Sequence, residues 1–229
     1  MRSTKKTARL AGLVYLLVAL PGFYGLLYVP SKVLVRGNPS ATARNILASP
    51  TFFRSGIVAD LLGQVAFILV GLLLYRLLKH VDRTAAGLMF LLVVVSIPIV
   101  FVAEVDHLSA LSVLDPSGPA AAFGQAQREA LMANALRAYS NTILVSEIFW
   151  GLWLLPLALL IWKSEFLPRF LGVFLLLAGS SYLVESLTRL LLPAGAEAVD
   201  RITGPLRALE LALPLWLLIV GAKDRPLPD

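Results

Sequence analysis

Charged and amide side chains interrupt nearly every long apolar run of this chain, close to the same end of each run. A charge that faces lipid at mid-bilayer costs roughly 2–3 kcal/mol, so such groups are expected to turn inward and pair. Intramembrane polar groups of this kind mark ligand sites and proton pathways. The candidate ligand-binding residues are Asp60, Gln64, Glu104, His107, Glu147, Trp150, Glu185, Arg189, Arg207 and Glu210.

The spacing of these residues adds detail, because positions three or four apart share one face of a helix. The acid precedes the base at Glu185 and Arg189, an order that suits an intrahelical ion pair. Trp150 follows Glu147 by three positions and can line the same pocket, although packing is its more common role. The spaced pairs are Asp60–Gln64, Glu104–His107, Glu185–Arg189 and Arg207–Glu210.

Two interpretations of this polar set remain open. In the first, Arg189 and Arg207 neutralise Glu185 and Glu210, and the resulting network only fixes helix packing. In the second, the groups line an outward-facing acidic cavity. Because acids outnumber the bases, that cavity favours a small cation, a proton relay, or an amine-bearing or hydroxyl-bearing polar ligand. We expect a binding or transport-like role from the second interpretation.

An intramembrane, hydrolase-like enzyme is the alternative, with Glu147 or Glu104 activating water beside His107. It requires a carboxylate within roughly 2.6–3.2 Å of His107. The chain has only two histidines and no cysteine, so it lacks HExxH and thiolate sites. No catalytic residue or cofactor is therefore assigned, and a carboxylate-plus-histidine metal site has weak support. A non-catalytic scaffold or partner subunit is the third possibility, and glycines such as Gly151 and Gly172 are typical of helix contacts.

The composition places the chain in a lipid bilayer. Hydrophobic residues make up 58% of its 229 residues and charged residues only 15%. A span needs about 20 apolar helical residues, and six such runs use up the chain. The net charge of +6 lies beside apolar runs, where it orients helices rather than binding nucleic acid.

The predicted fold is therefore all-α, a single integral membrane domain over 1–229 with six spans. Amphipathic segments over about 39–47 and 120–139 are expected to cap its outer face, the second as a helix separate from any span. Pro30 is predicted to end the first span, and 193–200 to form a loop before Gly204 and Pro205 open the sixth. The expected spans are 10–28, 56–78, 85–105, 142–162, 169–192 and 205–221.

The distribution of positive charge predicts the orientation. If both termini, the links at 79–84 and 163–169 and the helix-end residue Arg76 share one side, that side holds eleven of the twenty Lys and Arg residues, mostly in short segments. This density favours cytoplasmic termini. The eleven are Arg2, Lys5, Lys6, Arg9, Arg76, Lys79, Arg83, Lys163, Arg169, Lys223 and Arg225.

Several ordered blocks resemble a known family. They are ARLAGL at 8–13, ARNILA at 43–48, FRSGIVADLL at 53–62, EIFWGLWLLP at 147–156 and FLPRFLGV at 166–173. Together they resemble a bacterial multi-pass membrane family, the domain of unknown function forty-three eighty-six. The resemblance covers nearly the whole chain and implies a bacterial integral membrane protein, which we expect to lie in the cytoplasmic membrane. It implies no activity or cofactor, and its blocks contain Asp60 and Glu147.

Overall fold

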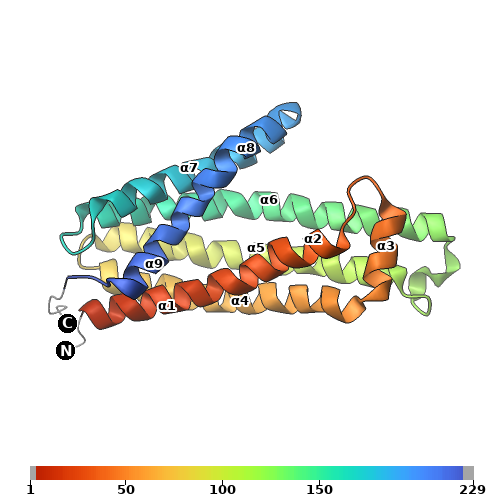
Figure 1. The fold of residues 1–229 in the computed structure, drawn as a ribbon, viewed down its shortest axis with the longest axis horizontal. Helices are drawn as coiled ribbons and strands as arrows, with labels where there is room; N and C mark the ends of the chain where they lie inside the picture. Colours follow the sequence, from red (N-terminus) through yellow and green to blue (C-terminus); the bar gives the residue numbers. More distant parts are fainter. Residues whose placement is uncertain (1–3, 224–229) are drawn as a thin grey trace. The chain divides into compact units, whose positions relative to one another are not determined.

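The structure is a computed structural model that describes residues 4–223, and within this range the chain is helical with no strand. Arg2 and Arg225, two of the charges that predicted the orientation, lie outside the described residues. Figure 1 follows the helices in chain order. They are α1 (Thr4–Gly22), the π-helical turn η1 (Phe23–Tyr28), α2 (Val29–Val33), α3 (Pro39–Ala48), α4 (Pro50–Leu78), α5 (Arg83–Leu114), α6 (Gln125–Lys163), α7 (Arg169–Leu191), α8 (Ala196–Arg207) and α9 (Ala212–Ile219), with short 3-10 turns at Pro119–Ala122, Pro193–Gly195 and Ala208–Leu211.

The chain is a multi-pass membrane protein. Between residues 4 and 223, six helical stretches are long and apolar enough to cross a bilayer. Each contains or closely overlaps one of the predicted spans, so the all-α, six-span prediction is confirmed. The stretches are Thr4–Val33, Pro50–Leu78, Arg83–Leu114, Gln125–Lys163, Arg169–Leu191 and Pro193–Ile219.

Three predicted boundaries were wrong. The segment 120–139 is not a separate helix for most of its length, because α6 runs unbroken from Gln125 to Lys163. No glycine or proline interrupts 125–141, so nothing in this segment stops a helix that has begun. Pro30 does not end the first span either, since it stands at the start of α2, where a missing N–H is tolerated. The predicted loop at 193–200 is largely helical, because α8 begins at Ala196 and contains Pro205.

Contacts divide the chain into two compact units. Unit 1 contains the described parts of Met1–Leu17, Ala66–Ile97 and Leu144–Asp229, and unit 2 contains Val18–Val65 and Pro98–Ile143. The unit boundaries fall within helices rather than in loops. That the chain is a single domain stays a prediction.

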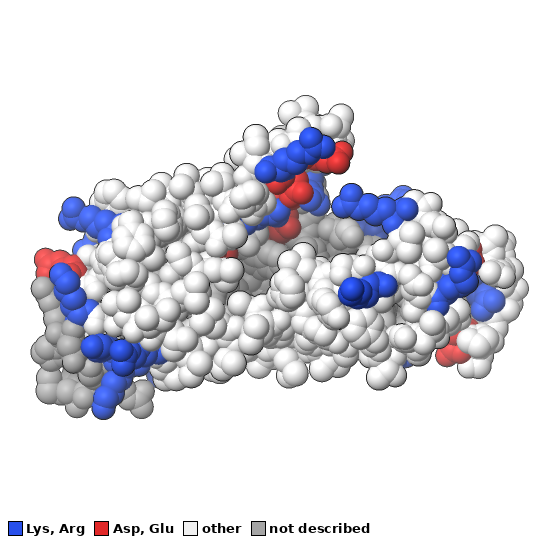
Figure 2. Space-filling view, viewed as in Figure 1, with Lys and Arg blue, Asp and Glu red and all other residues white. Residues whose placement is uncertain are grey.

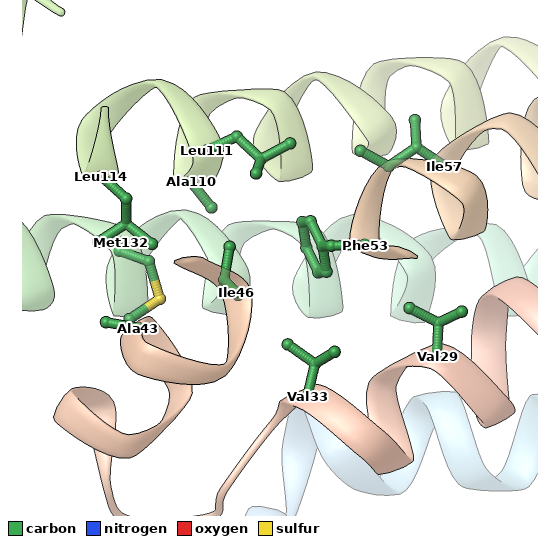
Figure 3. Close-up of a cluster of buried hydrophobic side chains, with 10 residues drawn as sticks. All are labelled: Val29, Val33, Ala43, Ile46, Phe53, Ile57, Ala110, Leu111, Leu114 and Met132. Carbon is green, nitrogen blue, oxygen red and sulfur yellow. The ribbon is translucent and has the colours of Figure 1, made fainter. Parts of the chain in front are cut away.

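Unit 2 has its own apolar core, which gathers around the short helix α3 (Figure 3). Asn38 caps α3 by accepting a hydrogen bond from the Ala41 N–H, and Ser40 of α3 donates to Glu129 of α6. The core side chains come from five helices, and Phe53 lies among them. They are Val29, Val33, Ala43, Ile46, Phe53, Ile57, Ala110, Leu111, Leu114 and Met132.

Unit 1 is held together by close helix packing. Figure 1 shows α7 and α8 side by side, and they are in contact. Gly151 of α6 faces Gly179 of α7 so closely that a Cβ at Gly151 would lie 2.7 Å from the Gly179 carbonyl oxygen. Gly12 of α1 likewise leaves no room for a Cβ beside Leu218. Small residues allow such backbone contacts in membrane proteins, as the sequence predicted for Gly151.

The surface of the described residues is apolar over wide areas. Figure 2 shows broad uncharged areas between small groups of charged side chains, with both signs of charge gathered on α8. Leu20, Leu62, Val102 and Ile219 are each more than half exposed, as expected of side chains that face lipid.

Candidate functional site

Four titratable side chains of unit 2 form one buried cluster. Asp60 comes from α4, Glu104 and His107 from α5, and Tyr139 from α6. Their exposed fractions are 3%, 2%, 5% and 8%. Burial of this degree is rare for carboxylates unless they are paired or functional.

The His107 ring is fixed on three sides. Its Nδ1 atom lies 2.9 Å from Oε2 of Glu104, so the spacing of these two residues did bring them together. Its face stacks on Tyr139 with ring centroids 3.6 Å apart, and the Phe53 ring meets it edge-on at 5.1 Å. The imidazole is therefore held in one orientation toward Glu104.

The carboxyl groups of this cluster lack sufficient partners. Asp60 and Glu104 act on each other electrostatically, and within residues 4–223 neither forms an ion pair with Lys or Arg. Even a protonated His107 would leave one of the two negative charges uncompensated. Four buried oxygen atoms in this part of unit 2 also have no hydrogen-bond partner among the described residues: Asp60 Oδ2, Gln64 Oε1, Glu104 Oε1 and Tyr139 Oη.

Gly25, within the π-helical turn η1, leaves room for Asp60. A Cβ at Gly25 would overlap the Asp60 carboxyl group, so only glycine allows this approach. The adjacent Tyr24 hydroxyl lies 2.7 Å from Ser55 Oγ of α4, which ties η1 to the same helix as Asp60. Single π-helical turns within α-helices occur frequently at functional sites.

Unit 1 contains a second polar cluster, and it is centred on Glu185 of α7. The fully buried Glu185 accepts hydrogen bonds from Arg189 at 2.6 Å and from Thr203 at 3.2 Å. Its other ion-pair partner is Arg207 of α8, at 2.5 Å. Both Glu185 oxygens are therefore satisfied, and the expected intrahelical pair with Arg189 is present.

Arg207 extends this network to other helices. It lies 2.7 Å from Asp200 and 3.8 Å from Glu147, and its guanidinium group stands 5.6 Å from the centre of the Tyr182 ring. Trp150 meets the same Tyr182 ring edge-on at 6.3 Å. Arg207 thus has acidic and aromatic partners that span α6, α7 and α8.

Glu210 does not join the arginines. It accepts a hydrogen bond from Tyr15 of α1, which is buried and packs against Trp153. The sequence had suggested Arg207 as the partner of Glu210 because the two are three positions apart. Instead Arg207 turns to Glu185, and a phenol satisfies Glu210.

The ten predicted residues thus separate into two groups. Asp60, Gln64, Glu104 and His107 belong to unit 2, and the other six to unit 1. Within residues 4–223, no group of three or more His, Asp or Glu side chains is arranged to hold a metal ion.

The tyrosines of both clusters were not among the residues predicted from the sequence. Tyr139 was assigned to a surface helix, and recognising 125–163 as one helix would have placed it two turns before Glu147. Tyr15 was interpreted as an interface anchor of the first span, and no sequence signal linked it to Glu210, which lies 195 positions away.

A family model described as a domain of unknown function, DUF4386, matches residues 10–221. No curated protein and no solved structure matches the chain.

Proposed function

The chain belongs to the DUF4386 family, and we propose that this member binds a proton or a small monovalent cation at the Asp60–Glu104 carboxyl pair of unit 2. One observation carries the proposal: two adjacent buried carboxyl groups lack a compensating cation and retain unpartnered oxygens. A buried charge is tolerated only when it is paired or neutralised. A proton or a bound cation supplies that missing positive charge.

The comparison with unit 1 supports this assignment. There the buried Glu185 already has two arginines and a threonine as partners, so it offers no open position to a ligand. The unit 1 network suits helix packing, and the unit 2 cluster suits ligand binding. Tyr139 and His107 supply a hydroxyl group and an imidazole that can relay a proton to or from Glu104.

Binding and infrared difference spectra of the purified chain test the proposal. A protonated carboxyl group gives its own carbonyl band, which should disappear in both Asp60→Asn and Glu104→Gln. If a cation is bound instead, titration with Na⁺, K⁺ or Li⁺ should show saturable binding that either substitution weakens about tenfold or more.

The matched control is Asp106→Asn, which removes a carboxyl group from the same helix without touching the pair. It should leave both the carbonyl band and the cation affinity unchanged. The proposal fails if the wild-type chain shows neither signal, or if Asp106→Asn abolishes the signal as completely as Asp60→Asn does.

The Glu104–His107 distance of 2.9 Å also favours the second candidate, a hydrolase-like membrane enzyme. This distance is short enough for direct proton transfer between the two side chains. Both groups are buried, however, and water activation needs access to water. Hydrolysis of p-nitrophenyl esters, lost in both Glu104→Gln and His107→Gln, would support the enzyme. If the chain hydrolyses no ester but does bind a cation or a proton, the leading proposal is supported.

We further propose that the protein resides in a bacterial cytoplasmic membrane with both termini inside. The cluster of positive charge in the short segments at 79–84 and 163–169 supports this orientation. Because the chain lacks cysteine, a single cysteine placed at Ser117 can report it. A membrane-impermeant thiol reagent should label the exposed Ser117→Cys from outside intact cells, whereas Thr84→Cys, also exposed, should react only after lysis. The reverse pattern would overturn the orientation.

A further inference from the structure

One end of unit 1 carries a pocket of about 440 Å³ that the polar clusters do not use. The start of α1, the end of α9 and the connection between α6 and α7 meet there (Figure 1). Lys5, Phe166, Pro168, Trp216 and Lys223 are among its lining residues. The volume falls in the usual range for small-molecule sites, about 300–1,000 Å³, and exceeds what a free inorganic ion fills.

The backbone at the end of α9 shapes this pocket. Gly221 has a φ of 79°, a left-handed conformation that favours glycine, and its N–H donates to the Trp216 carbonyl at 3.0 Å. The Lys223 N–H donates to the Phe166 carbonyl at 3.2 Å, which fixes the chain after α9 against the α6–α7 connection. Backbone hydrogen bonds thus hold the chain after α9 and the α6–α7 connection in place around the pocket.

Two basic side chains lie beside Gly221, and another lines the same pocket. A Cβ at that position would lie 3.2 Å from Lys5 Cγ and 3.5 Å from Arg9 Cγ, so both stems pass beside it. Lys223 adds a positive charge to that of Lys5 in the lining, while Glu165 is its one acidic residue among residues 4–223. Figure 2 shows Lys and Arg side chains gathered at this end of unit 1. The charge balance of the pocket therefore favours an anion.

The rest of the lining is apolar. Trp216, Phe166 and Leu167 contribute rings and aliphatic groups beside the lysines, at the end of a membrane-spanning helix. Basic side chains with an aromatic partner at the end of a span are typical of the headgroup region of a bilayer. We propose that this pocket binds the headgroup phosphate of an anionic glycerophospholipid, with Lys5 and Lys223 on the phosphate and Trp216 beside the glycerol and upper acyl chain.

Lipid titration of the full chain in detergent micelles, read by native mass spectrometry, tests this proposal. Phosphatidylglycerol should bind in a saturable manner, and phosphatidylcholine should bind much more weakly. Replacing both lysines in Lys5→Gln/Lys223→Gln should weaken phosphatidylglycerol binding about tenfold or more. A melting curve of the variant checks that it remains folded.

The matched control, Lys6→Gln/Lys32→Gln, removes the same charge from positions that do not line the pocket, and it should retain phosphatidylglycerol binding. Equal losses in the two variants would overturn the site, because they would indicate general attraction to the basic surface. A second titration with inorganic phosphate separates the sources of the anion. If inorganic phosphate displaces phosphatidylglycerol at equal concentration, the pocket is a free-anion site and the lipid proposal is wrong.

Discussion

Replacing Glu185 by Ala is expected to lower the free energy of unfolding by about 3 kcal/mol, near the lower end of the range for breaking a buried ion pair. The substitution leaves Arg207, whose side chain is only 21% exposed, without its closest acidic partner. Arg189 is 44% exposed and can turn to solvent, which keeps the loss from being larger. Unfolding titrations in mixed detergent micelles measure this difference.

Glu197→Ala is the matched control, since it breaks another helical Glu–Arg pair in unit 1. Glu197 and Arg201 are both highly exposed and 3.8 Å apart, so this pair contributes little. We expect its loss to change the free energy of unfolding by less than about 0.5 kcal/mol. If Glu197→Ala and Glu185→Ala destabilise the protein equally, the Glu185 network is not what holds α7 and α8 together.

The spans were predictable because hydropathy over some twenty residues is a strong local signal. The ends of the helices were not predictable, since α6 continues through Gln125–Asn141 as readily as through its apolar part. Helix formers continue a helix whether or not they lie in lipid, and the polar residues there carry no stop signal. Where turn-forming residues do stand, at Asp115 and Pro116, the helix stops, because α5 ends at Leu114.

The polar contacts within one helix were predictable for the same reason. Residues three or four apart must share a face, and Glu104–His107 and Glu185–Arg189 both form. Polar contacts between helices were not predictable, because a single sequence does not show which helix faces pack against one another. The pairing of Tyr15 with Glu210 and the approach of Gly25 to Asp60 both depend on helix packing.

The difference between the two clusters follows from their partners rather than from their composition. Both contain two or more buried or half-buried carboxyl groups and at least one tyrosine. Arginine is present in the unit 1 cluster, where it satisfies Glu185, and it is not an ion-pair partner of Asp60 or Glu104 in the described part of unit 2. A sequence-based count of acids against bases could not reveal this, because it treated the ten residues as one set.

Gly25→Ala is expected to abolish ligand binding at the carboxyl pair. The new methyl group would occupy the space of the Asp60 carboxyl group, so either Asp60 must rotate away or η1 must move. Overpacking of this kind usually costs about 1–3 kcal/mol of stability, and the displaced Asp60 would no longer act with Glu104. We expect the cation affinity to fall about tenfold or more, or the protonated carbonyl band to disappear, as in Asp60→Asn.

Gly22→Ala separates this steric effect from a general response of the first span to alanine. Gly22 lies one turn before Gly25, and a Cβ there would meet nothing within 4 Å. Alanine stabilises a helix by about 1 kcal/mol relative to glycine, so Gly22→Ala should fold at least as well as the wild type and bind normally. Normal binding by Gly25→Ala would contradict the close approach of η1 to Asp60, because no methyl group fits in the position that the carboxyl group occupies.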